Sequence, residues 1–84
     1  MKNKADFLTQ LALNIREQRK LQLFSQDSFA KHLKIARRNY CDIEAGKINP
    51  SILLLMKIAL GLNVSLVTLI PEGFSLHELK DAAD

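Results

Sequence analysis

The chain has 84 residues, of which 48% are hydrophobic and 25% are charged, and this balance favours a single folded domain over a disordered segment. One cysteine excludes a disulfide framework, and three glycines with two prolines are too few for a turn-rich β-barrel or sandwich. The net charge of +3 is unevenly spread, because residues 1–50 contain ten Lys or Arg against five Asp or Glu, whereas residues 51–84 contain two against four. The basic half suits a polyanion and the acidic, aliphatic half suits self-association, although a solvated charged surface would have the same composition.

The N-terminal segment is expected to form an amphipathic helix over about residues 5–20. Its apolar residues recur three and four positions apart from Phe7 to Ile15, which is the period of an α-helix. Charged residues follow at once, so the segment lacks the apolar centre of a signal peptide. The longest apolar run, Ile52–Met56, is too short to span a bilayer. These features, together with the lone cysteine, predict a cytoplasmic protein.

Two short helices are predicted next, separated by a brief connection. Ser25 is a good N-cap for a helix that extends to about Leu33. Residues 34–36 connect it to a second helix over residues 37–44, and Gly46 supplies the stop for that helix. Two helices joined by a three-residue turn have the spacing of a helix-turn-helix.

The C-terminal half is predicted to be helical as well. Pro50 suits the start of a helix over residues 52 to about 62, and Asn63 can take the left-handed conformation that ends it. Residues 65–70 are expected to form a further helix, although their β-branched side chains leave a terminal strand open. Residues 75–78 form a capping box for a last, short helix.

Several segments in one register carry a family resemblance. Residues 24–30 read Phe-Ser-Gln-Asp-Ser-Phe-Ala, and residues 35–47 end in Ile-Glu-Ala-Gly-Lys. Residues 50–51, 55–59 and 62–65 continue in phase. Together these segments resemble the lambda-repressor/Cro-like (XRE-type) helix-turn-helix regulators, which include the controller proteins of restriction–modification systems.

The resemblance implies an all-α, five-helix domain with a short sixth C-terminal helix as an addition. It places a DNA-binding and dimerisation domain over residues 1–72, with the helix-turn-helix at about residues 25–45, and a short tail or helix over residues 73–84. The implied function is a transcriptional regulator that binds double-stranded DNA as a homodimer on a palindromic operator. Whether it activates or represses stays open.

Two alternative functions use the same fold. One is an antitoxin that binds DNA and also neutralises a toxin protein, and the other is a protein-interaction module that does not bind DNA. RNA polymerase is a further partner protein that a regulator of this type would meet. His32 and His77 are isolated, with no glycine-rich phosphate loop, metal-ligand cluster or paired nucleophile, so we expect no enzyme activity, cofactor or metal ion.

The second helix of the motif contains the side chains suited to reading bases. By position, the family's base-reading residues fall on Arg37, Arg38 and Asp42, with Asn39 beside them. Arg can donate two hydrogen bonds to guanine, Asn can pair with adenine, and Asp can accept from cytosine. The alternative for Arg38 and Asp42 is an exposed i,i+4 ion pair, worth only about 0.2–0.5 kcal/mol.

A second set of side chains is expected to contact DNA phosphates. Gln26 opens the first helix of the motif, where it would touch phosphate and brace the second helix. Ser25 is first an N-cap and only secondarily a phosphate contact, whereas Lys47 and Asn49 follow the second helix and face the backbone. Tyr40 is expected in the core with its hydroxyl reaching outward, and a phosphate contact is the alternative.

The resemblance also implies a structural ion pair between Arg19 and Glu44, which would join the first helix to the end of the recognition helix. Three positions depart from the family pattern. Ala36 leaves the recognition helix without a side-chain N-cap, Lys34 replaces the usual turn glycine, and Cys41 occupies a place commonly held by Ser. A small, half-buried role is expected for Cys41, since no second cysteine could resolve an oxidised form.

Aliphatic side chains stand where the family pattern expects polar ones, at Leu53, Leu54, Leu60 and Val67. An exposed apolar stripe marks an interface, and a two-fold dimer would cover it. The alternative is that residues 74–79 fold back over the stripe. The residues predicted to form the dimer interface are Leu53, Met56, Leu60, Val67 and Ile70.

Overall fold

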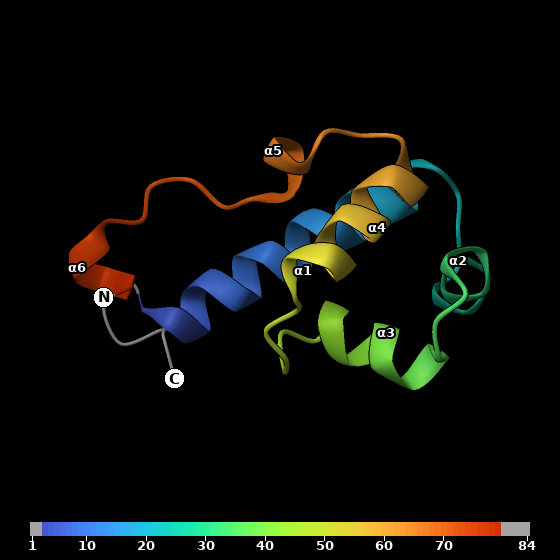
Figure 1. Cartoon of the computed structure of the whole chain (residues 1–84), viewed down its shortest axis with the longest axis horizontal. Coiled ribbons are helices and arrows are strands. Elements are labelled where there is room, and N and C mark those ends of the chain that lie inside the picture. The colour runs from blue at the N-terminus through green and yellow to red at the C-terminus, as the bar shows by residue number, and fades with distance from the viewer. Residues whose placement is uncertain (1–2, 80–84) are drawn as a thin grey trace.

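In the computed structural model, which describes residues 3–79, six helices follow one another and those residues contain no strand (Figure 1). The helices are α1 (Lys4–Leu21), α2 (Gln26–Leu33), α3 (Arg37–Glu44), α4 (Ile52–Leu62), α5 (Leu66–Leu69) and α6 (Leu76–Leu79). The predicted all-α fold is confirmed, including the sixth short helix. The last five residues of the expected tail, 80–84, lie outside the described part of the chain.

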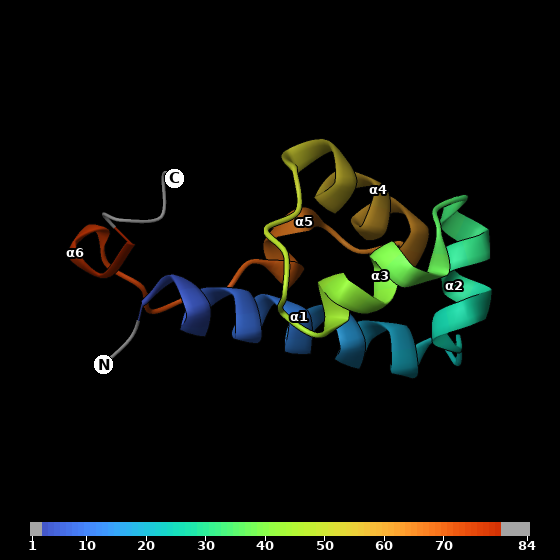
Figure 2. The same cartoon turned by 90° about the horizontal axis from the view of Figure 1, so that it is seen from below.

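The other helices are arranged along the long helix α1. Helices α2, α3 and α4 pack around its C-terminal half, and α6 lies near its N-terminal end in both views (Figures 1 and 2). The chain measures 37 × 22 × 20 Å along its principal axes. No helix within residues 3–79 has the length and apolar character needed to cross a membrane.

The core is built where α1 to α5 meet. The ring of Tyr40 lies edge-on to that of Phe29, with ring centroids 5.3 Å apart, and this contact joins α3 to α2. A favourable aromatic pair adds to the burial of apolar area that holds the helices together. The largest wholly buried side chains are Tyr40, Phe29, Ile15, Ile43, Ile58, Leu62 and Leu69.

Local signals determine where most helices begin. Ser25 accepts a hydrogen bond from the Ser28 amide at 3.0 Å and so caps α2, as expected. Ser51 caps α4 in the same way, and a capping box formed by Asn3 and Asp6, which the sequence analysis did not identify, starts α1.

Two helices end in the backbone conformations that their sequences predict. Asn63 ends α4 with a φ of 56°, and Gly46 follows α3 with a φ of 71°. Lys34 does adopt the left-handed conformation, at a φ of 60°, in place of the glycine that would take it without strain. Ala36 starts α3 with no side-chain cap, as its methyl group requires.

The segment after α4 is a helix and not a strand, but it is shorter than predicted. Helix α5 covers Leu66–Leu69, because Ile70 is already extended before Pro71. Ser65 stands at the N-cap position without making a backbone cap bond, and its hydroxyl lies 3.1 Å from that of Thr68 instead.

The described part of the tail does not cover the apolar stripe. The ring of Phe74 packs edge-on against Phe7 at the N-terminal end of α1, with centroids 5.2 Å apart. The alternative in which residues 74–79 fold over the stripe on α4 is therefore wrong. The direction of the tail is decided by this aromatic pair, whose two members are distant in sequence.

Candidate nucleic-acid interface

Helix α3 presents a polar face to solvent and an apolar face to the core. Arg37, Arg38 and Asn39 are exposed and Asp42 is half-buried, so the four predicted base-reading side chains lie on the accessible part of the helix. Arg38 and Asp42 do not form the alternative i,i+4 ion pair, since the only ion pairs among the described residues lie elsewhere. The side chains of Arg37 and Arg38 also make no hydrogen bond to any residue within 3–79, which leaves both guanidinium groups available to a ligand.

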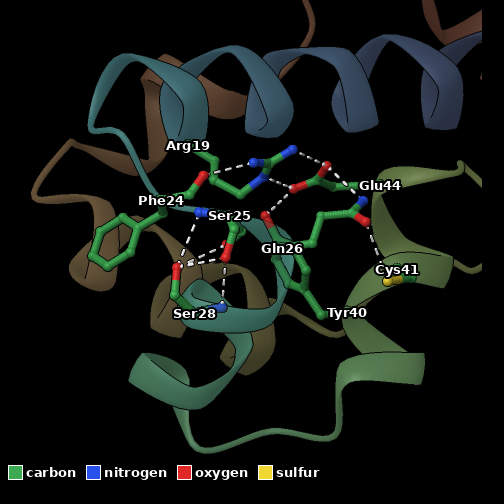
Figure 3. Close-up of polar contacts among 8 residues, drawn as sticks. All are labelled: Arg19, Phe24, Ser25, Gln26, Ser28, Tyr40, Cys41 and Glu44. Carbon is green, nitrogen blue, oxygen red and sulfur yellow. Dashed lines mark hydrogen bonds and ion pairs between the residues drawn. The ribbon is translucent and has the colours of Figure 1, made fainter.

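Arg19 and Glu44 form a two-bond ion pair between α1 and the end of α3 (Figure 3). The Arg19 Nε lies 2.6 Å from one Glu44 carboxylate oxygen, and Nη2 lies 3.0 Å from the other. The third guanidinium nitrogen donates to the Phe24 carbonyl at 2.7 Å, in the connection that leads to α2. Both charged side chains are almost fully buried, at 8% and 2% exposure, so the pair acts as an internal brace for the recognition helix.

Glu44 receives two further hydrogen bonds, from the hydroxyl of Tyr40 and from the side-chain amide of Gln26 at 3.1 Å. Burial alone would raise the pKa of Glu44, but the bonds from Arg19, Tyr40 and Gln26 outweigh it and lower that pKa. The hydrogen bond to Glu44 raises the pKa of Arg19 against the opposing effect of burial. The carboxylate is thus held ionised by donors from all three helices, α1, α2 and α3.

Tyr40 is not accessible to a DNA phosphate. Its side chain is wholly buried, and its hydroxyl donates to Glu44 instead of reaching outward. Burial, with the Glu44 bond, raises the pKa of Tyr40, so the hydroxyl stays a donor to that carboxylate. The prediction of an outward hydroxyl was wrong because a buried acceptor four residues along the same helix satisfies it.

Gln26 braces α3 more than its position in the sequence indicated. Its amide nitrogen donates to Glu44, and its amide oxygen accepts a hydrogen bond from the Cys41 thiol, with the two atoms 3.4 Å apart. Figure 3 shows the side chain turned toward α3. One amide N–H of Gln26 is left for a ligand. Cys41 is half-buried, as expected, and its thiol contributes to this brace.

The other predicted phosphate contacts lie at the surface. Ser25 is exposed, but its hydroxyl is already engaged in the α2 capping box with Ser28. Lys47 and Asn49 are exposed in the loop after α3. The sequence analysis missed Arg16, an exposed side chain of α1 that lines a hollow together with Gln26 and Arg37. Arg16 lies on the polar face of an amphipathic helix, and that pattern does not indicate that it lies near Gln26 and Arg37.

The predicted dimer surface is largely exposed in the single chain. Leu53, Leu60 and Val67 are 80%, 72% and 75% exposed, and Met56 is also exposed. Ile70 does not belong to this surface, because it is half-buried against the core. Ile52, which was not predicted, extends the surface at the start of α4. We call the exposed residues Ile52, Leu53, Met56, Leu60 and Val67 the apolar patch.

Comparison with known proteins identifies this arrangement. The sequence profile of the HTH_3 family, described as helix-turn-helix, matches residues 15–69, which include α2, α3, α4 and α5. The chain belongs to this helix-turn-helix family. It is a DNA-binding transcriptional regulator. No curated protein sequence matches the chain significantly.

Solved structures of other proteins have a similar fold. The restriction–modification controller protein C.AhdI from Aeromonas hydrophila is 25% identical, with a TM-score of 0.72, over 75% of this chain and 96% of that one. An HTH_3 family transcriptional regulator from Vibrio cholerae is 30% identical, with a TM-score of 0.74, over 80% of this chain and 38% of that one. A hypothetical transcription factor from Neisseria, at 24% identity and a TM-score of 0.75, covers 84% of this chain and 82% of its own and shows the fold alone.

Proposed function

We propose that this HTH_3 member recognises a specific sequence in double-stranded DNA by inserting α3 into the major groove. The observation that supports this best is the division of α3 into an exposed polar face and a face fixed from within. Arg37, Arg38 and Asn39 are exposed, while Glu44 on the same helix is bonded to both α1 and α2. A recognition helix held rigidly by its own domain can present side chains to base edges in a defined register.

The roles of the individual side chains follow from their chemistry. Arg37 and Arg38 read guanine, Asn39 reads adenine, and Asp42 accepts a hydrogen bond from cytosine. Lys47, Asn49 and the amide groups at the start of α2 bind phosphates and set the register of the protein on the duplex.

We further propose that the protein binds DNA as a homodimer through the apolar patch. Its residues are exposed in the single chain, and the described tail lies at the other end of α1. A stable interface covers about 1,000 Å² or more of total surface, which two copies of a helix-borne patch with two-fold symmetry can provide. The operator would then be a palindrome with half-sites about 34–36 Å apart on one face of the duplex.

A homodimer of this kind would act in the cytoplasm, and its concentration would set the occupancy of the operator. The likeness to C.AhdI, a restriction–modification controller protein, supports a controller role, in which dimerisation and DNA binding are linked. A toxin or RNA polymerase is an alternative partner for the apolar patch. A monomeric protein in solution would favour that alternative.

Selection of bound duplexes from random DNA, followed by titration at several salt concentrations, tests the proposal. We expect a palindromic consensus and a binding constant that falls steeply as salt increases, because the contacts release counterions from phosphates. A scrambled duplex should bind about 10³-fold or more weakly than the consensus. Failure to enrich any sequence, or equal binding of consensus and scrambled duplexes, would contradict sequence-specific recognition.

A further inference from the structure

A hollow on the surface lies where α1, α2 and α3 meet. Arg16 of α1 and Arg37 of α3 both line it, and Gln26 opens α2 between them. The Cys41 and Glu44 side chains line it as well, so the hollow borders the brace drawn in Figure 3. The hollow therefore lies between α1 and the face of the helix-turn-helix that is proposed to bind DNA.

The charges around the hollow do not cancel. Glu44 is neutralised by Arg19, and Asp27, the other acidic residue that lines the hollow, lies 3.2 Å from the ammonium group of Lys31. The side chains of Arg16 and Arg37 have no hydrogen bond or ion pair with any residue in the described range 3–79. Two unpaired guanidinium groups thus face a hollow whose acidic groups already have cationic partners, and this favours an anion there.

The α2 backbone adds donors at the same place. The amide groups of Gln26 and Asp27 find no acceptor within residues 3–79, because an α-helix leaves its first N–H groups unbonded and the Ser25 hydroxyl caps Ser28. The Gln26 side chain, by contrast, is bonded to Glu44 and Cys41. A phosphate at the start of α2 could therefore accept from these backbone amides and from the one remaining Gln26 side-chain N–H, and a charged side chain from another helix can add to them.

We infer that Arg16 binds a DNA phosphate at the start of α2, so that the DNA-binding surface extends from the helix-turn-helix onto α1. The ligand is a phosphodiester group of duplex DNA, which a guanidinium can grip with two parallel N–H donors. Arg16 is a positioning residue, since a phosphate contact sets the register of α3 on the duplex without reading a base. This inference rests on the proposed DNA binding.

The test is a salt titration of the full chain with the Arg16→Ala variant against the selected duplex and a scrambled duplex. Each lost phosphate contact lowers the slope of log binding constant against log salt by about 0.9, so a bound homodimer should lose about 1.8. Affinity should fall by the same factor for both duplexes, and the ratio between them should stay constant. Arg16→Lys should restore the slope and only part of the affinity, because it keeps the charge but loses the paired donors.

Lys20→Ala is the matched control, since Lys20 lies one turn further along α1 and faces a separate surface beside Glu17 and Leu21. It should leave the slope within error of the wild type, and thermal melts of both variants should match the wild-type midpoint. An unchanged slope in Arg16→Ala, or an equal loss in Lys20→Ala, would overturn the inference while leaving DNA binding intact. A wild type that binds neither duplex would overturn the proposed function and this inference together.

Discussion

The exposed faces of α3 and α4 differ in polarity, because the first is polar and the second is apolar. Helix α3 has polar groups outside and a buried carboxylate, Glu44, with hydrogen bonds from α1, α2 and its own helix. Helix α4 buries Leu55, Ile58, Ala59 and Leu62 and is apolar on its outer face too. A polar face is stable in water by itself, whereas an exposed apolar patch raises the free energy of the chain until another surface covers it. We propose that the first surface binds DNA and that the second is covered by a further chain.

The largest expected effect comes from breaking the brace of α3. Arg19→Ala should lower the free energy of unfolding by about 3–5 kcal/mol, because it leaves the buried Glu44 carboxylate without its cation. Thermal and denaturant melts measure this. At a temperature where the variant is still folded, its DNA affinity should change far less than its free energy of unfolding. An unchanged melting midpoint with DNA binding lost would place Arg19 in the DNA contact instead.

The same brace should make the fold sensitive to acid. The pKa of Glu44 is lowered from its ordinary value of 4.5, so the unfolded chain binds the proton more tightly than the folded chain. The stabilisation is present above pH 4.5 and is lost as the pH falls through the lower, folded-state pKa. Denaturant melts across this acid range should show the loss in the wild type. In Glu44→Gln this contribution to the pH dependence should be absent.

The apolar patch is tested by placing a charge in it. Leu60→Glu should raise the dissociation constant of the homodimer on the order of 100-fold, because a carboxylate without a partner would be buried. Sedimentation equilibrium at micromolar concentration measures this, and cognate DNA affinity should fall with it. Since Leu60 is 72% exposed in the single chain, each monomer should still fold. A variant that stays dimeric would show that the patch is not the interface.

A smaller effect is expected from a single base contact. Arg38→Ala should cost about 1–3 kcal/mol of cognate binding and relax the preference at one base pair. Its side chain is exposed and unpaired within the described residues, so the melting midpoint should not change. Titration against cognate duplexes substituted one pair at a time measures the preference. Full specificity in the variant would remove Arg38 from the base-reading set.

The smallest effect concerns the start of α3. Ala36→Ser should stabilise the fold by about 1 kcal/mol, because the new hydroxyl can accept from an amide that Ala36 leaves without a side-chain cap. Ser51→Ala is the converse variant at α4, where the Ser51 hydroxyl accepts from the Leu54 amide at 3.1 Å, and it should destabilise. Melts of the two variants should therefore shift in opposite directions.

Local sequence determined the elements of this protein. The cap at Ser25, the left-handed Asn63 and the apolar period are short-range signals, and they predicted the start of α2, the bounds of α3 and the approximate bounds of α4. The family motifs likewise fell on residues that the structure exposes or braces as expected, such as Arg38 and Glu44. Such signals act within one or two helical turns, so a reading along the chain is sufficient to find them.

Only the tertiary structure decided what lies beside these elements. The inward hydroxyl of Tyr40, the burial of Ile70 and the packing of Phe74 on Phe7 depend on partners whose positions no local pattern specifies. Arg16 is the clearest case, since it looks like any charged residue on an amphipathic helix until α2 and α3 are folded against α1. Packing brings such distant residues together, because burying the apolar faces of several helices fixes their relative positions and hence the neighbours of every polar side chain at their edges.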